Sequence, residues 1–312
     1  MRKPSATSEM PPVYLPPLPS WVTQIHGNTL ETVTFFSGAS LSLLHMMLTD
    51  PGGKLPVELL RNRLALCAAE ACLRLEGRRD SAADIRDAYY LTRAGDAMGP
   101  AGEMFARWRK AGAIGLKRRD WLARLKACVP EHVAAGLPEW VDMATGQGGS
   151  PVAQAARMTG LVVEAFAREE TTALICGDVV LARALGWTHP LPLLGMSVRR
   201  KVVRNITVEA CHLAAARSAE SALRLGHDLT RRAERLRAIA PKLRAKGAEA
   251  AVALFLREDA VLPSTMLSPR VKGTSIPMTP RAARRLCDRL VELDVVRELT
   301  GRSTFRLYGV GS

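Results

Sequence analysis

The sequence predicts an all-α protein, in which a multi-helix body is followed by a C-terminal winged-helix-like module with one small β-hairpin. The chain has 312 residues, of which 47% are hydrophobic but only 5% aromatic, and Ala and Leu recur throughout. A core of this composition favours packed helices over sheets. Apolar residues recur at three- and four-residue steps in most segments before residue 295, which is the helical period.

The first 27 residues form a proline-rich arm, because prolines at this density exclude a helix and favour an extended chain. We expect the arm to pack on its own domain rather than to serve as a docking peptide. A helical body follows over residues 28–246, and turns rich in Gly and Pro separate its helices. The predicted helices of the body cover residues 29–48, 56–77, 81–91, 101–111, 120–128, 151–168, 171–185, 198–226 and 228–239.

Two features of the sequence predict where one part of the chain ends and the next begins. The glycine-rich stretch 136–150 resists regular structure and is the best candidate for an internal boundary of the body. A further helix, with Pro241 in its first turn and its end near Arg257, leads into the C-terminal module, which we define as residues 247–312.

The module contains the clearest helix start in the chain. Thr279 supplies a hydroxyl N-cap, and Pro280 follows at the first helical position. We expect this helix to end near residue 293 and to follow a short, broken helical turn at residues 263–267. Its apolar face consists of Ala282, Ala283, Leu286, Leu290 and Leu293. Another face carries Arg281, Arg284, Arg285 and Arg289, and within these nine residues Asp288 is the one acidic side chain.

Two strand-like runs, 295–299 and 304–308, follow this helix and predict a hairpin. Between them Gly301 can take a positive φ, and Arg302 places a cation at the tip of the hairpin. Asp294 stands between helix and hairpin, at a point where glycine would accept a left-handed turn more readily. A helix followed by a basic hairpin is the order of a recognition helix followed by a wing.

The charge of the chain is concentrated in its second half. The net charge is +14, and residues 197–312 hold 23 of the 44 basic residues but only 11 of the 30 acidic ones, which gives them 12 of the 14 surplus charges. A basic half beside a near-neutral half favours a polyanionic partner. The simpler interpretation is a solvated helical surface rich in arginine.

These features predict a DNA-binding accessory or regulatory protein whose helical body serves interaction or dimerisation. A helix fits the major groove of double-stranded DNA, where guanidinium groups reach phosphates or guanine edges, and a wing tip reaches the neighbouring backbone. We expect Arg281, Arg284, Arg285, Arg289 and Arg302 to make these contacts. The alternative is a helical scaffold, or a homodimer, whose winged-helix tail binds protein.

A compact polar stretch offers a third alternative, an enzyme site. Asp84, Arg86, Asp87, Arg93 and Asp96 could cluster to hold a metal or to do acid–base work. Because no histidine nearby completes a ligand set, we favour a helix end fixed by ion pairs and caps. We therefore expect no catalytic residue, no metal site and no cofactor. Trp187 and His189 lie in a turn bounded by prolines and are candidates for a binding role. A tryptophan packed under a turn is the more common arrangement.

The sequence predicts a cytoplasmic protein with no membrane partner. The start of the chain is polar and proline-rich, unlike a signal peptide. Its most apolar run, residues 33–48, is short for a bilayer and predicts a buried core helix. The six cysteines are scattered without ligand spacing, as expected of free thiols in a reducing compartment.

Three stretches of the sequence are similar to a known bacterial family. They are residues 84–102 (DIRDAYYLTRAGDAMGPAG), 178–194 (DVVLARALGWTHPLPLL) and 281–310 (RAARRLCDRLVELDVVRELTGRSTFRLYGV). Together they resemble the family known as domain of unknown function 1403, over nearly the whole chain after the arm. The last stretch also looks like the C-terminal winged-helix segment of other bacterial proteins. The resemblance implies that body and module belong together as one unit, and it brings no activity and no catalytic residue.

Overall fold

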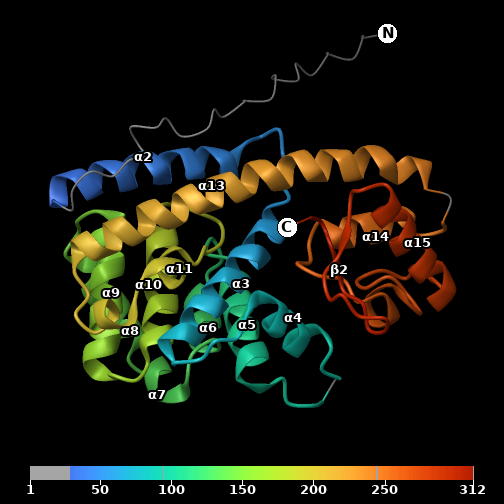
Figure 1. The fold of residues 1–312 in the computed structure, drawn as a ribbon. Helices are drawn as coiled ribbons and strands as arrows, with labels where there is room; N and C mark the ends of the chain where they lie inside the picture. Colours follow the sequence, from blue (N-terminus) through green and yellow to red (C-terminus); the bar gives the residue numbers. More distant parts are fainter. Residues whose placement is uncertain (1–28, 94, 244, 312) are drawn as a thin grey trace, which may run out of the picture.

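A computed structural model describes residues 29–93, 95–243 and 245–311. The predicted fold class is confirmed: helices dominate, and the strands of the described chain form one two-stranded antiparallel sheet near its C-terminal end (Figure 1). The predicted proline-rich arm lies outside the described residues. The helices of the body are α2 (Leu30–Thr49), α3 (Val57–Leu75), α4 (Ala82–Tyr90), α5 (Gly99–Gly112), α6 (Trp121–Lys126), α7 (Glu131–Ala134), α8 (Leu137–Gly146), α9 (Pro151–Ala165), α10 (Glu170–Ala184), α11 (Leu193–Ser197), α12 (Arg200–Val203) and α13 (Val208–Ile239), followed by the turn η1 (Ala240–Lys242).

Helix α13 organises the molecule, because its 32 residues extend over about 48 Å. Its first half packs against α2, and its second half passes the C-terminal module (Figure 1). The two predicted helices 198–226 and 228–239 are therefore wrong, since one helix runs through Gly226. A Cβ atom at Gly226 would lie 2.5 Å from Sδ of Met47. The glycine thus allows α2 to approach closely, and it does not end the helix.

Helix α2 has the length and apolar composition of a membrane-crossing segment, but 39% of its most apolar window is buried in the protein. Val33, Leu41 and Leu44 point into the molecule. The hydroxyl of Ser37 lies 2.6 Å from Nδ1 of His212 in α13. The segment packs on the core along one face, but Leu30, Phe35 and Met46 on the other face are about half exposed, so the prediction of a buried core helix is correct only for the inner face.

Two further predictions about elements need correction. A regular helix, α8, covers residues 137–146 of the stretch expected to be irregular, because Leu137 and Ala144 are buried by neighbouring helices. Irregular backbone in this stretch is confined to Gly136 and residues 147–150. The helix predicted from Pro241 to residue 257 is divided, since Gly247 has a φ of +88° and a new helix begins after it.

The module contains α14 (Ala248–Phe255), the helical turn η2 (Pro263–Leu267), α15 (Pro280–Glu292), β1 (Arg297–Glu298) and β2 (Tyr308–Gly309). Strand β1 pairs with β2, and Val261 forms a further antiparallel bridge with Tyr308. The predicted hairpin and the short turn at 263–267 are confirmed, although both strands are shorter than expected.

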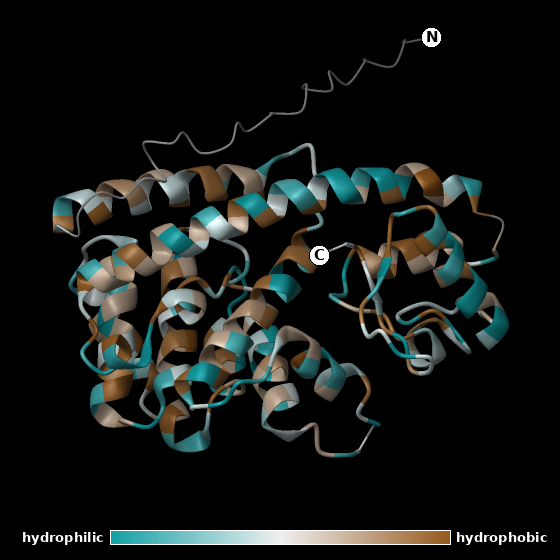
Figure 2. Ribbon diagram, viewed as in Figure 1, coloured by the Kyte–Doolittle hydropathy of each residue, from teal (hydrophilic) through white to brown (hydrophobic). Residues whose placement is uncertain are grey.

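One continuous cluster of buried apolar side chains runs from Leu41 in α2 to Val310 beyond β2. Helix α3 crosses this cluster and contacts α4, α5, α11 and α13. The hydropathy colours show apolar residues on the inner faces of the helices and hydrophilic ones along the outer turns of α15 (Figure 2). Body and module therefore share a core, and the module keeps a polar outer surface.

Candidate nucleic-acid interface

Helix α15 begins as its sequence predicts. The side-chain oxygen of Thr279 accepts a hydrogen bond from the backbone N–H of Ala282 at 3.2 Å, and Pro280 occupies the first turn. Ala283, Leu286 and Leu290 are buried on one face, together with Cys287. Burial of this face fixes which side of the helix points outward.

The outward face of α15 is basic, since Arg281, Arg284, Arg285 and Arg289 are all exposed. Arg289 forms an ion pair with Glu292, whose carboxylate lies 2.9 Å away. Within the described residues no carboxylate pairs with the other three arginines. Helix α15 lies at the outer edge of the module, away from the body (Figure 1). Three unpaired guanidinium groups on an accessible helix can bind an anionic surface.

The turn after α15 sets the direction of the hairpin. Asp294 adopts a φ of +51°, so this aspartate takes the left-handed conformation for which glycine would be the easier choice. Its carboxylate lies 3.6 Å from the guanidinium of Arg235 in α13, which ties the turn to the long helix. Gly301 has the expected positive φ, +64°.

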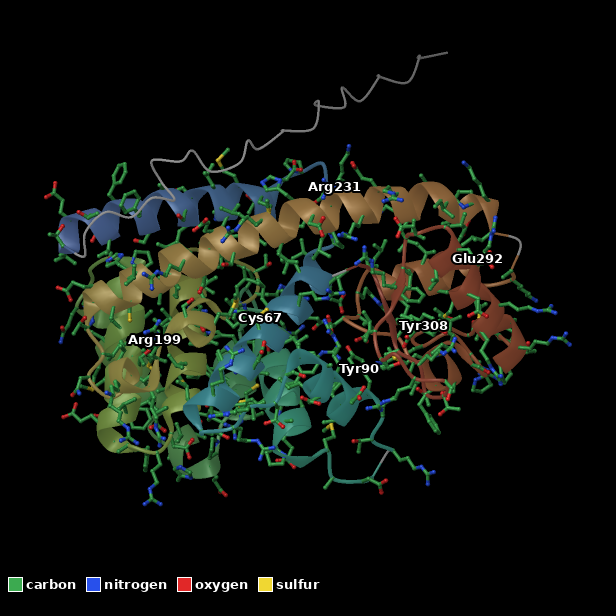
Figure 3. The ribbon with its side chains drawn as sticks, in the orientation of Figure 1. Cys67, Tyr90, Arg199, Arg231, Glu292 and Tyr308 are labelled. Carbon is green, nitrogen blue, oxygen red and sulfur yellow. The ribbon has the colours of Figure 1, made fainter. Side chains whose placement is uncertain are left out.

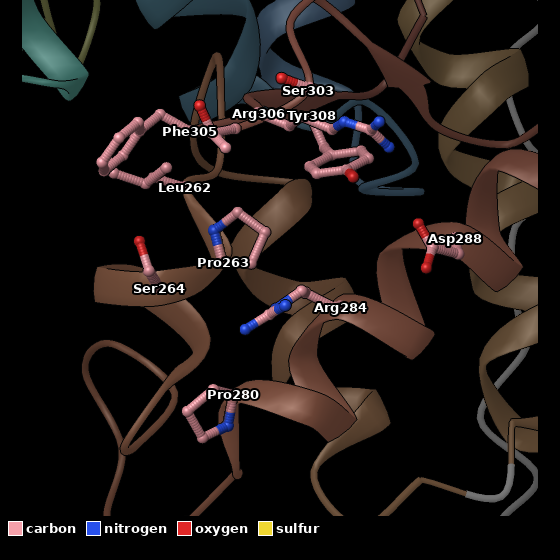
Figure 4. A pocket seen from close by; sticks show the side chains of 11 residues that line it. Leu262, Pro263, Ser264, Pro280, Arg284, Asp288, Ser303, Phe305, Arg306 and Tyr308 are labelled. Carbon is pink, nitrogen blue, oxygen red and sulfur yellow. The ribbon is translucent and has the colours of Figure 1, made fainter.

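A cavity of about 450 Å³ separates α15 from the hairpin loop (Figure 4). Arg284 and Asp288 line it from α15, and Arg306 and Tyr308 line it from the other side. Phe305, at its rim, is 67% exposed and has a positive φ. The cavity thus brings two guanidinium groups and an aromatic ring to one surface.

Arg302 does not join this surface. Its guanidinium lies 2.5 Å from the carboxylate of Asp87 in α4, so the hairpin tip is directed toward the body. Arg302 would have to exchange Asp87 for a phosphate in order to contact DNA.

The polar stretch 84–96 is likewise not assembled into one site. Asp84 accepts from Ser81 in a capping box at the start of α4, and this hydrogen bonding lowers the pKa of its carboxyl. Arg86 binds Asp259 in the module at 2.6 Å. Arg93 and Asp96 are exposed, and no described carboxylate or cation pairs with their side chains. In the described parts of the chain, no three His, Cys, Asp or Glu side chains gather as metal ligands.

The structure reveals a charged group that the sequence did not indicate, at the junction of body and module. Asp259 is fully buried and is ion-paired with both Arg63 of α3 and Arg86 of α4. The guanidinium of Arg63 also donates to the carbonyl oxygen of Val310 at 3.0 Å. We call this group, with the neighbouring contacts of Glu258, the junction cluster.

Glu258 completes the junction cluster through Arg109 of α5, whose Nη2 lies 2.6 Å from its carboxylate, and through Lys272 at 3.1 Å. Burial raises the pKa of Glu258, but the positive charges of Arg109 and Lys272 outweigh burial and hold the pKa below its ordinary value. Tyr90 lies in the same junction (Figure 3), and its hydroxyl is 3.3 Å from Arg109. The junction cluster thus fixes the module on the body.

One signal could have indicated the junction cluster. Glu258 and Asp259 are adjacent acids between the apolar runs AVALFL and AVL, separated from the first by a single arginine. Arg63 follows Arg61 and Asn62 and directly precedes the apolar run LALCAA of α3. Buried charges require partners of opposite charge, but the sequence alone does not show that Arg63 pairs with Asp259.

Comparison with known proteins gives a family and no activity. The family DUF1403, described as a protein of unknown function, matches residues 7–310. No curated protein matches the chain at a significant level.

Proposed function

The chain belongs to the DUF1403 family, and we propose that this member binds double-stranded DNA through the arginine face of α15, as an accessory or regulatory protein. The observation that carries the proposal is the row of four exposed arginines on a helix whose opposite face is buried. Guanidinium groups spaced along one helix face suit the phosphates and guanine edges of a major groove.

The order of elements around α15 supports this proposal. Helix α14, the bridge at Val261, turn η2, helix α15 and the β1–β2 hairpin follow one another as in a winged helix, with Val261 beside the last strand. In that arrangement α15 corresponds to the recognition helix. The cavity between α15 and the hairpin loop, lined by Arg284 and Arg306, offers room for a backbone that passes between helix and wing.

A second candidate function is protein binding by the same module. Phe305 and Val291 are exposed apolar side chains near the arginine face. Aromatic side chains and arginines are enriched at protein interfaces. The two candidates differ in the residues they require: DNA binding depends on the arginines, and protein binding depends on Phe305.

Replacement of Arg281, Arg284, Arg285 and Arg289 by Ala tests the first candidate. We expect duplex affinity to fall by about tenfold or more. The slope of log K against log salt should flatten by about 0.9 for each phosphate that the variant no longer neutralises. Fluorescence anisotropy with a labelled duplex at several salt concentrations measures both quantities. The buried face of α15 is unchanged, so the variant should fold.

A matched control removes four exposed cations elsewhere, by replacing Arg79, Arg199, Lys201 and Arg217 with Ala. It lowers the net charge equally but should leave most of the affinity and the slope intact. Equal weakening in both variants would show a general charge effect, and an unchanged slope in the α15 variant would contradict the proposal. Phe305→Ser should preserve duplex binding.

A further inference from the structure

A second cationic cavity lies in the body, away from α15. Its volume is about 500 Å³, and it is lined by the loop between α5 and α6 and by the end of α10. The charged residues in its lining are Lys117, Arg118, Arg119 and Arg183, and none of the described residues that line it is acidic.

Three of these four cations have no carboxylate partner in the described chain. Arg118 is paired with Asp120 at 2.8 Å, and this contact lowers the pKa of the Asp120 carboxyl to about 2. No carboxylate in the described part of the chain forms an ion pair with Lys117, Arg119 or Arg183. Like charges around one cavity repel one another, and an anion placed between them relieves the repulsion.

Arg183 is held in place by groups that carry no net charge. Its guanidinium lies over the ring of Trp121, 4.0 Å from the centroid, and donates to the carbonyl oxygen of Leu116 at 3.2 Å. Burial lowers the pKa of Arg183. The N–H of Leu116 donates in turn to the carbonyl oxygen of Thr188, which fixes the loop against the segment after α10.

We propose that this cavity binds a phosphate group carried by a nucleotide, either free or at the end of a nucleic-acid strand. Three unpaired cations in the lining of one cavity match a ligand with more than one negative charge, and a guanidinium fork binds phosphate oxygens in pairs. The volume exceeds that of an inorganic ion and falls within the range of small-ligand sites. The Arg183 guanidinium and the ring of Trp121 both line the cavity, and planar groups of this kind can stack with a nucleotide base.

The test is isothermal titration of the full chain at low salt with ADP, with inorganic pyrophosphate, and with a single-stranded hexanucleotide that carries or lacks a 5′-phosphate. We expect the combined change Lys117→Gln and Arg183→Gln to weaken binding of ADP or of the 5′-phosphorylated strand at least about tenfold. Arg119→Gln alone should weaken binding several-fold. Arg119 is exposed, so its replacement should leave the loop folded.

Arg199→Gln with Lys201→Gln is the matched control. Arg199 and Lys201 lie at the start of α12. Arg204, directly after α12, pairs with Glu170 in the first turn of α10. Arg183 lies in the last turn of α10, about 20 Å along the helix from Glu170. Tighter binding of ADP identifies a free nucleotide, and tighter binding of the phosphorylated strand identifies a strand end. Absence of binding by all probes, or equal weakening in the control, overturns the proposal. The α15 variant should keep this binding, so the two proposals fail independently.

Discussion

At the scale of single residues, Asp178 illustrates how one buried carboxyl positions a helix. Asp178 lies in the middle of α10 and is 1% exposed. Its two oxygens accept the backbone N–H groups of Leu194 and Gly195, at 2.8 and 3.0 Å, in the first turn of α11. These N–H groups have no partner within the helix, so Asp178 satisfies them from outside.

Burial raises the pKa of Asp178 to about 8, although the backbone N–H groups oppose the rise. The folded protein therefore keeps a proton that the unfolded chain releases near pH 4. Stability contributed by the protonated group is present at low pH and is lost as the pH rises toward 8. We expect the free energy of unfolding to fall by about 3–4 kcal/mol more between pH 5 and pH 8 in the wild type than in Asp178→Asn, which does not titrate.

Urea denaturation of both proteins at the two pH values measures this difference. Other titrating groups are common to both proteins and cancel. Parallel pH profiles would mean that Asp178 is ionised in the folded protein.

Residue-scale features were predictable where the partners are close in sequence. The Thr279 cap and the arginine face of α15 follow from spacing within one helix, because a neighbour three or four residues away is fixed by the helical period. Arg63 and Asp259 were not predictable, since they are 196 residues apart and their pairing depends on the final packing. For the same reason Arg302 and Asp87, both singled out from the sequence, gave no sign that they pair with each other.

At the scale of elements, glycines within helices mark close approaches. Gly177 faces α9 from α10, and a Cβ atom there would lie 2.2 Å from Oγ1 of Thr159. That hydroxyl is itself bound to the carbonyl oxygen of Ala155 at 2.9 Å and cannot move freely. The close packing of α9 against α10 therefore depends on a residue without a side chain at position 177 (Figure 1).

We expect Gly177→Ala to destabilise the protein by about 2 kcal/mol, because overpacking outweighs the gain of about 1 kcal/mol in helix propensity. Gly160 in α9 is the matched control, since a Cβ atom there would meet only Ile206 at an ordinary 3.5 Å. Gly160→Ala should stabilise by about 0.5–1 kcal/mol. Thermal unfolding of both variants measures the two effects, and stabilisation of both would contradict the close approach.

Most elements were predictable because apolar periodicity records which face of a helix is buried. The errors arose at glycines, because a glycine in the sequence looks like a break in a helix. Gly226 looked like a helix end but lies inside α13 against Met47, and the glycine-rich stretch after Gly136 looked irregular but contains α8. Sequence alone does not distinguish a glycine that ends a helix from one that admits a neighbour.

At the scale of the whole molecule, body and module are joined by the shared core and by the junction cluster. The domain boundary predicted near residue 247 remains a prediction. The buried pairs of Asp259 with Arg63 and Arg86 link α3 and α4 to the segment after α14. Removing one partner from a buried ion pair leaves an uncompensated charge, which costs about 3–5 kcal/mol.

We therefore expect body and module to unfold in a single calorimetric transition, with equal calorimetric and van't Hoff enthalpies. Asp259→Asn should lower the free energy of unfolding by about 3–5 kcal/mol. Asp288→Asn, an exposed carboxylate in the same module, should change it by less than about 0.5 kcal/mol. Two separate transitions in the wild type would show that the module is an independent domain.

The contact of Arg63 with Val310 also has a consequence for protein synthesis. The two residues are 247 positions apart, so Arg63 leaves the ribosome long before its acceptor. At about 5–20 residues per second, the interval is roughly 10–50 s. Asp259 follows Arg63 by 196 positions, so for most of that time the nascent body carries a cation on α3 whose buried partners have not been made. Chains that terminate before Asp259 would keep this charge uncompensated, and we expect cellular proteases to remove them.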